Sequence, residues 1–472
     1  MSTLRATTLT TLDDTFSVSI KDLITADDVP ESFVKIASYA ALQSTTPSAA
    51  NEIVYLMQYI STNQYKGGGF FRAISGSGTE NYGTVCVPNS STTFYWQRIN
   101  YTDITPDMFG AISNGTSDNV SAFTRALAVC KSVGKRLYVP AGTYYCSGTI
   151  TVPAGVQIVG ESQQQTTLRF ADSSHGFTVS ASSNYVRFKS LTIRNVSTAK
   201  TSGYHGIYAN GVAISTGSIG FLDIDDCNIF GFDCAFYGIA CQLGIFSNST
   251  FWACNKGIYT KLCVNMRYDE CRIQLNSSWG WHADGDSSAI SLSCGTLVNS
   301  CEFVNNGASS GGSIFVNYNE HFTINNCMID VPNTGSTSHV VISNTSRGTI
   351  SSCWIGASKY AGVNLASCTC VNINGCNILS SGTYGLTLTG SCNGCVINGN
   401  SFESNPSGDV SISGTGCLYN VFTGNAFAST TATNSLVEGG NYYTCATGNM
   451  AKKAITLATG SGSVSSGNLT LA

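Results

Sequence analysis

A short signature, Cys-x-(Ile/Phe), returns at nearly regular intervals through the middle of this 472-residue chain. It runs from Cys227-Asn228-Ile229 to Cys376-Asn377-Ile378, and Ser249, Asn400 and Asn425 take the place of the cysteine in further copies. From Cys227 to Asn425 the steps between copies are 22, 22, 30, 26, 26, 23, 24 and 25 residues. A period in the twenties is typical of stacked structural repeats. The chain is therefore predicted to form a solenoid.

Each repeat contains three short strand signals. An apolar residue usually stands three places before the signature, as Ile224 does before Cys227, which indicates two strands joined by a two-residue corner. An upstream Gly-apolar pair, such as Gly257-Ile258, marks a third strand in several copies. The segment lacks the 3.6-residue apolar period of a helical solenoid. The predicted fold class is all-β: a parallel β-helix with three strands per coil, in which like residues stack about 4.8 Å apart.

The repeat also accounts for many of the 20 cysteines. Cysteines at the same point of successive coils predict an inward column of free thiols that pack as small hydrophobes. The N-terminal stretch MSTLRATTLTT lacks the apolar core of a signal peptide, which predicts synthesis in a reducing cytosol. Cys368-x-Cys370 and Cys392-x-x-Cys395 have ligand-like spacing, but no second His or Cys pair follows at zinc-finger spacing. Disulfides and metal binding are therefore the disfavoured alternatives, and no metal and no cofactor are predicted.

The composition limits the possible partners. Charged residues make up 11% of the chain and the net charge is -4, whereas nucleic-acid binders normally carry a basic patch. No run of 18 apolar residues occurs, so no membrane insertion is predicted. Abundant Gly, Ser, Thr and Asn suit an extended β solenoid with many turns. These features predict neither a nucleic-acid partner nor a membrane-embedded protein.

Residues 1–103 follow a different pattern. Short alternating segments, among them Ile36–Leu42, are separated by Gly and Ser turns and predict a small N-terminal β domain. The turn Gly67-Gly68-Gly69-Phe70, the strand Trp96-Gln97-Arg98 and the segment Thr105–Ala111 follow in this order. With these segments the region resembles the N-terminal region of bacteriophage tailspikes. The resemblance implies that residues 1–103 form a head-binding-like region that attaches to the virion.

The segment that follows is similar to the entry of the pectate-lyase-like superfamily. The similarity rests on Phe109-Gly110-Ala111, on the turn 114–118 and, after a helix, on the stretch 138–144. The family commonly has Gly-Asp-Gly-x-x-Asp-Asp after Phe-Gly-Ala, and this chain has Ser-Asn-Gly-Thr-Ser-Asp-Asn. The change removes one acidic residue at a site usually regarded as a structural turn. The resemblance extends over roughly residues 60–430.

An apolar stripe at i, i+3, i+7 and i+10 from Val120 to Cys130 predicts a helix over residues 118–133. Asp118 is the predicted N-cap, and Gly134 is the predicted terminator. An amphipathic helix at this point would cover the open end of the solenoid, since terminal repeats need a cap. The predicted organisation is an N-terminal region 1–103, a β-helix with its capping helix over 104–438, and a short C-terminal β segment over 439–472.

The resemblance to tailspikes implies a right-handed parallel β-helix and a homotrimer. It implies a protein that binds and degrades a host surface polysaccharide, capsule or O-antigen, and that joins a phage tail or baseplate protein through its N-terminal region. Such a protein is made in the host cytoplasm, is carried in the virion and acts at the bacterial cell surface. Because fold alone does not establish activity, a non-enzymatic receptor-binding spike and a cellular pectinase-like lyase are the alternatives.

Aromatic and charged residues crowd the outward positions of the coils between residues 208 and 320. Alignment of the coils places Tyr208, Tyr259 and His282 in one outward column. A second column, two residues further along each strand, contains Tyr237, Lys261 and Asp284. Aromatic rings and polar groups on one face are the components of a carbohydrate site. The predicted substrate-binding residues are Tyr208, Asp223, Tyr237, Tyr259, Lys261, Arg267 and His321.

The predicted catalytic residues are Asp284, Asp286 and Glu320, together with His282. In a hydrolase, one acid protonates the leaving oxygen while the other activates water or attacks the sugar. Carboxylates one coil apart lie about 5 Å from each other, which suits a retaining hydrolase. Two coils give about 10 Å, near the upper edge of the inverting range. Hydrolysis of a glycosidic bond is the first prediction.

A lyase would use other residues of the same group. His282 or Lys261 would take the proton α to a uronate carboxylate, and Arg267 would neutralise that carboxylate. Acids from two subunits could also combine in one site. Asp225-Asp226 and Asp269-Glu270 fall at the tight corner and are predicted to be turn residues. A structural role is predicted for the isolated histidines His175, His205 and His339.

Overall fold

The computed structural model describes residues 33–61, 66–90, 93–197, 199–289, 293–330, 337–414, 416–440, 443–458 and 462–470. Contacts divide the chain into two compact units. The first unit comprises the residues up to Thr102 and Asp107–Gly110, and the second comprises Asp103–Pro106 and the residues from Ala111 onward. Within the described ranges, no helix is long and apolar enough to cross a membrane.

The first unit is a five-stranded sheet with one short helix. In spatial order its strands are β1 (Val34–Ile36), β2 (Ile53–Leu56), β3 (Gly69–Ser75), β5 (Phe94–Arg98) and β4 (Val85–Cys86). The helix α1 (Tyr39–Ser44) begins after Ser38, whose hydroxyl accepts a hydrogen bond from the Ala41 N–H at 3.2 Å. The predicted strand over Ile36–Leu42 is therefore wrong after Ile36, because the serine cap starts a helix there.

A buried arginine joins the glycine turn to the strand that follows it in the tailspike-like pattern. The Arg98 guanidinium donates hydrogen bonds to the carbonyl oxygens of Gly67, Gly68 and Gly83 at 2.8, 2.6 and 3.0 Å. Burial lowers the pKa of Arg98 to about 10. Gly69 has φ 147°, and a Cβ at this position would lie 2.5 Å from Nη1 of Arg98. The turn therefore requires glycine at this position.

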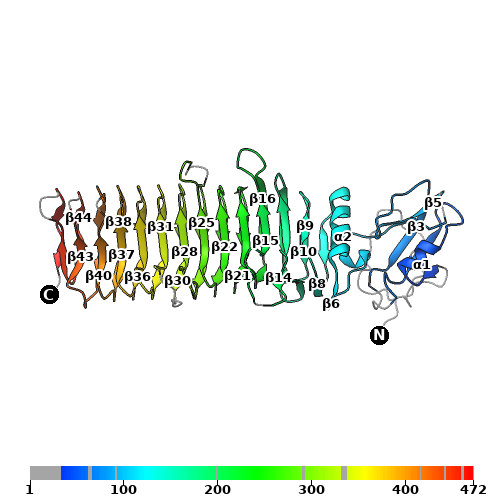
Figure 1. The fold of residues 1–472 in the computed structure, drawn as a ribbon, viewed down its shortest axis with the longest axis horizontal. Coiled ribbons are helices and arrows are strands. Elements are labelled where there is room, and N and C mark those ends of the chain that lie inside the picture. Colours follow the sequence, from blue (N-terminus) through cyan, green and yellow to red (C-terminus); the bar gives the residue numbers. More distant parts are fainter. Residues whose placement is uncertain are drawn as a thin grey trace, which may run out of the picture. The chain divides into compact units, whose positions relative to one another are not determined.

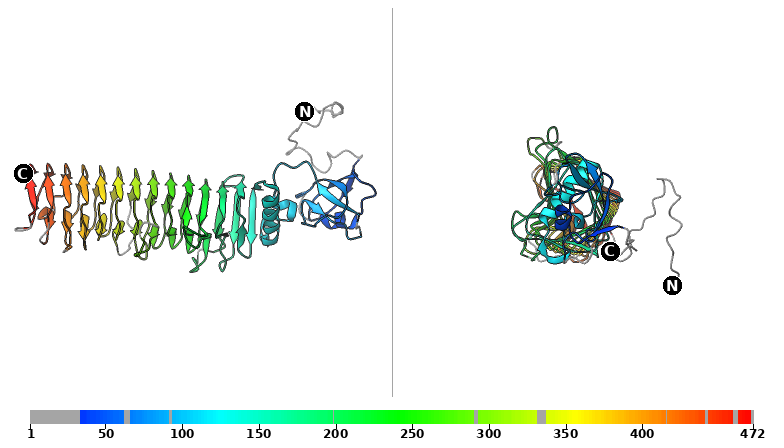
Figure 2. Two further views of the ribbon diagram at one scale, coloured as in Figure 1. Left: turned by 90° about the horizontal axis from the view of Figure 1, so that it is seen from above. Right: turned by 90° about the vertical axis from the view of Figure 1, so that its right-hand side faces the viewer.

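The second unit is a parallel β-helix of three sheets whose coils stack along one direction (Figures 1 and 2). Sheet I contains β7 (Leu137–Val139), β10 (Gln157–Gly160), β13 (Asn184–Lys189), β16 (Ile219–Asp225), β19 (Cys241–Gln242), β20 (Ile245–Ser247), β23 (Arg267–Asp269), β26 (Leu297–Asn299), β29 (Thr323–Asn325), β32 (Thr349–Ser351), β35 (Asn372–Asn374), β38 (Val396–Asn398), β41 (Val421–Thr423), β44 (Cys445–Thr447) and β47 (Val464–Ser466). Sheet II contains β6 (Asn114–Asp118), β8 (Gly142–Cys146), β11 (Thr166–Phe170), β14 (Thr192–Asn195), β17 (Asn228–Phe230), β21 (Thr250–Trp252), β24 (Arg272–Gln274), β27 (Glu302–Val304), β30 (Met328–Asp330), β33 (Trp354–Gly356), β36 (Asn377–Leu379), β39 (Ser401–Glu403), β42 (Ala426–Phe427), β45 (Met450–Ala451) and β48 (Leu469–Thr470). Sheet III contains β9 (Ile150–Val152), β12 (Phe177–Ser180), β15 (His205–Asn210), β18 (Cys234–Ile239), β22 (Lys256–Lys261), β25 (Trp279–Asp284), β28 (Ile314–Asn317), β31 (Val340–Ser343), β34 (Val363–Ala366), β37 (Tyr384–Thr389), β40 (Gly408–Ile412), β43 (Asn434–Glu438) and β46 (Ala454–Thr456).

Residues along each strand alternate between the interior and the surface. In most three-residue strands of sheets I and II, such as β20, β23 and β24, the middle residue is buried and its two neighbours face outward. The parallel register joins residues with the same role in successive coils, for example Ile224, Phe246 and Tyr268. The interior is therefore one continuous apolar column shared by all coils. The predicted fold class, with three strands per coil, is confirmed.

The corner between sheets I and II carries the predicted column of cysteines. Cys271, Cys301 and Cys327 are at most 2% exposed, and all cysteines of the chain are free. The Cys301 thiol donates to the carbonyl oxygens of Tyr268 and Asn299 at 3.4 and 3.3 Å. A small polarisable side chain thus fills the corner without leaving its S–H group unpaired. The predicted inward column of free thiols is confirmed.

The residue before each cysteine makes the corner sharp. Asp226 and Glu270 have φ values of 51° and 52°, in the left-handed region. Asparagine and glycine adopt this region with less strain, and they occupy the same position in other coils, as Asn326 and Gly375 do. The prediction of turn residues is confirmed for Asp226 and Glu270 and is wrong for Asp225 and Asp269, which are the last residues of strands β16 and β23.

Asparagines replace the cysteines of this corner toward the C-terminus. The Nδ2 groups of Asn400, Asn425 and Asn449 each donate to Oδ1 of the asparagine in the next coil, at 3.1, 2.9 and 2.9 Å. The last acceptor is Asn468. Strands β44 to β48 pair in parallel with the coil before them. The C-terminal β segment therefore continues the same three sheets.

Helix α2 (Val120–Val133) lies at the N-terminal end of the coils (Figure 1). It buries the predicted apolar stripe, and the Phe123 ring packs edge-on against Tyr144 with centroids 5.6 Å apart. The helix begins two residues later than the predicted range 118–133. Its N-cap is Asn119, because Asp118 still belongs to β6, although the Asp118 carboxylate accepts the first helical N–H at 3.2 Å. The prediction of a capping helix is confirmed, and the prediction of Asp118 as N-cap is wrong.

The burial of the thiols gives a testable reactivity pattern. Cys370 is the one exposed cysteine, whereas burial raises the pKa of ladder thiols such as Cys227 to about 12. Thiolate is the reactive form, so we expect about one thiol per chain to react rapidly with a disulfide reagent in the native protein. Denaturant should release all 20. The Cys370→Ser variant should lose the rapid phase, and rapid reaction of many thiols in that variant would contradict the ladder.

A buried acid in β40 gives a second prediction. Burial raises the pKa of Asp409 from 3.8 to about 6. Because the pKa of Asp409 is raised in the folded state, its protonated carboxyl stabilises the fold. This contribution to stability is complete below pH 4 and is lost as the pH rises through 6. We expect the free energy of unfolding of the Asp409→Asn variant to rise by about 2 kcal/mol relative to that of the wild type between pH 4 and pH 7. Thermal unfolding at both pH values measures the gain, with exposed Glu403→Gln as the control. An unchanged difference at the two pH values would refute it.

Candidate functional site

The outer face of sheet III carries an unbroken column of aromatic rings. Tyr208, Tyr237, Tyr259, His282 and Phe315 are direct register neighbours on five successive coils. The predicted column is therefore confirmed for Tyr208, Tyr259 and His282. The placement of Tyr237 in the adjacent column is wrong by two residues, because β18 starts at Cys234, opposite the first residue of β15.

The rings of this column cover one another. Tyr237 lies between His205 and Tyr259, with centroid distances of 4.3 and 4.6 Å and nearly parallel planes. Tyr208 stacks on His175 at 4.6 Å. His282, by contrast, meets Tyr259 and Phe315 edge-on, at interplanar angles of 68° and 85°. The column therefore combines stacked and edge-on ring contacts.

Asp284, at the end of β25, is joined to two members of the column. Its Oδ2 accepts a hydrogen bond from the Tyr259 hydroxyl at 3.0 Å and lies 2.9 Å from Nε2 of His282. The contact with His282 lacks good hydrogen-bond alignment and is an ion pair only when the imidazole is protonated. Burial alone would raise the pKa of Asp284, but its contacts with His282 and Tyr259 hold that pKa below its ordinary value. Burial and the nearby Asp284 charge raise the pKa of Tyr259, which keeps the phenol protonated.

Two lysines of β22 flank this cluster. Lys261 is the register neighbour of Asp284 and is exposed, and the Lys256 ammonium lies 5.2 Å above the ring of Tyr259. An ionised carboxylate, a protonated phenol, an imidazole and two cations therefore occupy one stretch of sheet III. This set can bind a negatively charged sugar and can move a proton.

Asp286 lies just beyond this strand and is fully exposed. Its carboxylate accepts hydrogen bonds from the hydroxyl and the backbone N–H of Ser288 at 2.7 and 2.8 Å, and these contacts lower the pKa of Asp286. Among the described residues, Asp286 makes no hydrogen bond or ion pair with Asp284. In this conformation it caps its own turn.

Glu320 and His321 lie at the corner that follows β28. The Glu320 carboxylate forms an ion pair with Arg347 and lies 3.8 Å from Nδ1 of His321. His321 has a left-handed backbone with φ 52° and an imidazole that is 57% exposed. The contacts of Glu320 are thus with the corner residues and not with the column on sheet III.

Asp223 and Arg267 lie on sheet I, two coils apart in one column. Burial raises the pKa of Asp223, while Arg267 forms an ion pair with Asp269 of its own strand. The two residues belong to a different sheet from Tyr259 and Asp284. The structure therefore does not gather all of the predicted site residues on one face.

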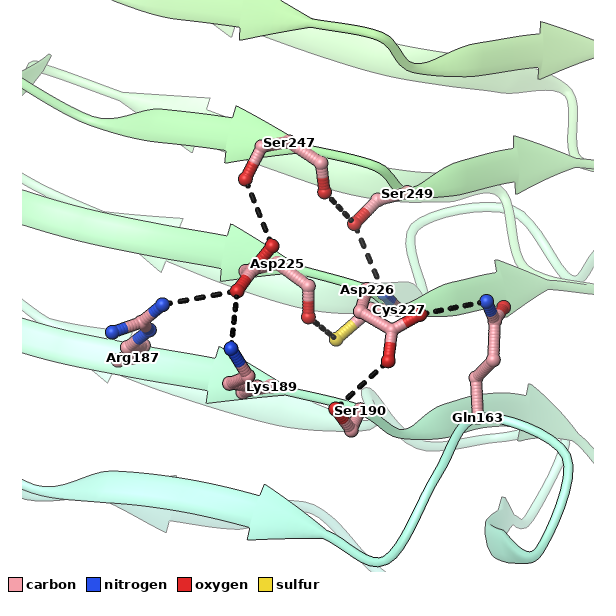
Figure 3. A network of polar contacts seen from close by, with 9 residues as sticks. All are labelled: Gln163, Arg187, Lys189, Ser190, Asp225, Asp226, Cys227, Ser247 and Ser249. Carbon is pink, nitrogen blue, oxygen red and sulfur yellow. Dashed lines mark hydrogen bonds and ion pairs between the residues drawn. The ribbon is translucent and has the colours of Figure 1, made fainter.

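The acids that follow Asp223 bind the coils together (Figure 3). The Asp225 carboxylate accepts hydrogen bonds from Arg187 and Lys189 of the preceding coil at 3.0 and 2.9 Å. Opposing charges hold the pKa of Asp225 low against the effect of its burial. The same network includes Gln163, Ser190, Asp226, Cys227, Ser247 and Ser249. These acids therefore join neighbouring coils.

Sequence analysis missed Trp279 as a member of this surface. Trp279 faces outward, and its ring packs against Phe315 with centroids 5.1 Å apart. Trp281, whose direction the sequence left open, is 1% exposed and points into the core. Two-residue alternation gave no signal for this difference, because it places residues two apart on the same side of a strand. In β25 the alternation is broken, since Gly280 and Trp281 are both buried.

One group of residues in the described part of the chain has the composition of a metal site. The ligand atoms of His205, Asp233 and Cys234 lie within 4.8 Å of one another. Asp233 already accepts hydrogen bonds from the Gly203 N–H and the Asn255 amide at 2.8 and 2.9 Å. These bonds provide a structural reason for the carboxylate without a metal ion. The cysteine pairs 368/370 and 392/395 belong to corner columns or face solvent.

Comparisons with protein families match three parts of the chain. Residues 35–101 match the phage tail protein small four-stranded beta-sheet domain. Residues 107–201 match the rhamnogalacturonase A/epimerase, pectate lyase-like family, and residues 283–462 match the right handed beta helix region. A phage-tail domain is thus followed by a right-handed β-helix of the pectate-lyase-like class.

Individual phage proteins are also similar to this chain. The capsule K2-specific depolymerase of Klebsiella phage vB_KpnP_KpV74 is 25% identical over 354 residues, which are 69% of this chain and 58% of that protein. Tailspike protein 2 of Escherichia coli O157:H7 bacteriophage CAB120 has a TM-score of 0.58 at 16% identity, over 89% of this chain and 52% of that one. A tailspike protein of Acinetobacter baumannii bacteriophage Fri1, a capsular polysaccharide depolymerase, has a TM-score of 0.59 at 12% identity, over 86% and 75%.

The predicted resemblance to bacteriophage tailspikes with a pectate-lyase-like β-helix is confirmed by these matches. The chain spans little more than half the length of the curated relative and of the CAB120 tailspike. At these identities the likeness to the solved structures establishes the fold, and the chemistry has to be argued from the residues on sheet III.

The contact between Tyr259 and Asp284 gives a prediction. Without the phenol hydroxyl, the Tyr259→Phe variant should lose about 1 kcal/mol of stability at neutral pH. Because the pKa of Asp284 is lowered in the folded state, this loss should shrink as the pH falls below 4 and the carboxylate is protonated. Thermal unfolding at pH 3 to 7 measures it. Tyr208→Phe in the same column is the control, and an equal loss at every pH would remove Asp284 from the explanation.

Proposed function

We propose that this protein is a phage tailspike that binds and degrades a polysaccharide on the surface of its bacterial host. The observation that carries the proposal is the contact of Asp284 with Tyr259 and His282 on the aromatic column of sheet III. The similarity to the capsule depolymerases of the Klebsiella and Acinetobacter phages supports it. Sheet III is proposed as the catalytic surface.

Hydrolysis remains the first proposed reaction. Asp284 is ionised at neutral pH and can activate water or attack the sugar. The second acid would be Asp286, two residues further on, or Glu320 in the next coil. Either acid would have to exchange its present partner, Ser288 or Arg347, for the leaving oxygen of the substrate. Substrate binding would supply this rearrangement.

A specific observation supports β-elimination as the second candidate. The protonated Tyr259 hydroxyl lies beside the ionised Asp284 carboxylate, and Lys261 stands next to them. In an elimination, the Asp284 carboxylate would remove the proton α to a uronate carboxylate and Lys261 would neutralise that carboxylate. The Tyr259 phenol would protonate the leaving oxygen. This arrangement requires an acidic polysaccharide, whereas hydrolysis does not.

The attachment role is proposed for the first unit. Its match to a phage-tail domain supports binding to a tail or baseplate protein, and the tailspike relatives support a homotrimer. The protein would be made in the host cytoplasm, carried in the phage tail and act at the bacterial surface. In a trimer, residues of two chains could complete the site.

The decisive experiment incubates the purified protein with capsular and O-antigen polysaccharides of candidate hosts. Asp284→Asn should lower the rate of chain shortening at least a hundredfold, because it removes the ionised carboxylate but preserves its shape. Glu403→Gln, an exposed acid on sheet II, should leave the rate unchanged. Product size is measured by chromatography.

Product absorbance separates the two reactions. Shorter products that absorb in the ultraviolet as unsaturated uronates mean elimination, and shorter products without that absorbance mean hydrolysis. Full activity in Asp284→Asn would move the site away from sheet III. Binding of the host polysaccharide without shortening would mean that the protein is a receptor-binding spike and not an enzyme.

A further inference from the structure

The outer face of sheet II carries a second row of polar and aromatic side chains. Arg169, Arg194, Phe230 and Trp252 are register neighbours on successive coils. Beside them runs a second column of hydroxyl and amide groups, Thr167, Thr192, Asn228 and Thr250. The first three members of each column line a hollow of about 730 Å³. This hollow lies on a different sheet from the Asp284 cluster.

The two arginines of the hollow have no acidic partner in the part of the chain that the structure describes. Arg169 donates to the Gly115 carbonyl at 3.3 Å, and Nε of Arg194 donates to the Asn195 carbonyl at 3.1 Å. Within the described residues, neither guanidinium forms a salt bridge, and Nε of Arg169 is buried without a hydrogen-bond partner.. Two like charges on adjacent coils repel each other unless an anion lies between them. Consistently, burial and the Arg169 charge lower the pKa of Arg194.

The aromatic side of the hollow holds these groups in place. The Arg194 guanidinium lies over the Phe230 ring, 5.2 Å from its centroid, and Phe230 packs against Trp252 at 4.6 Å. The Trp252 indole N–H donates to Oδ1 of Asn228 at 2.7 Å, which links the two columns. The guanidinium thus has a fixed orientation, and its remaining N–H donors are available to a ligand.

We propose that the hollow on sheet II is a binding site for a sugar residue that carries a carboxylate. The planar guanidinium fork matches a carboxylate, and the threonine and asparagine side chains can bond to sugar hydroxyls. In the intact polysaccharide this residue would belong to the glycan of the proposed function, on which this part of the inference rests. Recognition of the free acidic sugar does not depend on cleavage.

The test measures binding of methyl β-glucuronide by saturation-transfer NMR to the full chain. Methyl β-glucoside, which lacks the carboxylate, is the matched ligand. We expect the glucuronide to bind and the glucoside to bind at least tenfold more weakly. Arg194→Gln should weaken glucuronide binding about tenfold, as should Arg169→Gln. Arg272→Gln, on the same sheet but paired with Glu302 at 2.8 Å, is the control and should bind like the wild type.

Circular dichroism confirms that each variant is folded, and the second arginine variant serves if the first does not fold. Asp284→Asn should retain glucuronide binding, which separates this site from the one on sheet III. Equal binding of glucuronide and glucoside, or full binding by both arginine variants, would overturn the proposal. Sulfate is then added as a competing anion. If sulfate binds to the hollow and neither sugar displaces it, the hollow is a site for inorganic anions, and its assignment to a sugar is overturned. Each outcome is independent of whether the protein cleaves a polysaccharide.

Discussion

Backbone hydrogen bonds between successive coils are the interaction on which the β-helix depends. Every strand of sheets I, II and III pairs in parallel with the strand one coil before it or one coil after it. One coil alone has too little interior to be stable, so each coil relies on its neighbours for burial. The corners must repeat for the register to persist, and small side chains such as Cys301 and Asn425 satisfy this need. At the N-terminal end, helix α2 replaces the missing neighbour.

The same register builds the functional surfaces. Residues that are about 25 positions apart in the chain become direct neighbours, as Tyr259 and Asp284 do. An outward column of aromatic or charged residues therefore needs only one suitable residue per coil, because each coil contributes one side chain at a fixed position. Sheet III presents tyrosines with a carboxylate, whereas sheet II presents arginines with threonines. The two faces offer different chemistry on one scaffold.

The sequence predicted the repeat, the three strands per coil, the cysteine column and the capping helix because each rests on local patterns with a clear period. It also predicted most of the sheet III column. The errors have a common cause. Tyr237 was misplaced because the step between coils changes from one repeat to the next, and a two-residue shift moves a side chain into the adjacent column. Trp279, which packs against Phe315, was missed because alternation along the strand is broken at the buried pair Gly280 and Trp281.

The grouping of the acids shows the limit most clearly. Asp284, Asp286 and Glu320 are near one another in the coil alignment, but Asp286 caps its own turn and Glu320 pairs with Arg347. The partner of each carboxylate depends on the path of the loops and on long side chains that reach across coils. The periodic pattern of the sequence contains no information on these contacts. Likewise, Asp223 and Arg267 carry the right chemistry but lie on sheet I.

By itself the sequence determined the period, the alternation of inward and outward residues and the family resemblance, because stacked coils need the same residue pattern at equivalent positions. Only the tertiary structure decided which outward residues touch, which partner each carboxylate takes, and where two arginines have no counter-charge among the described residues. Those outcomes arise from contacts between coils, where register, corner length and side-chain reach act together.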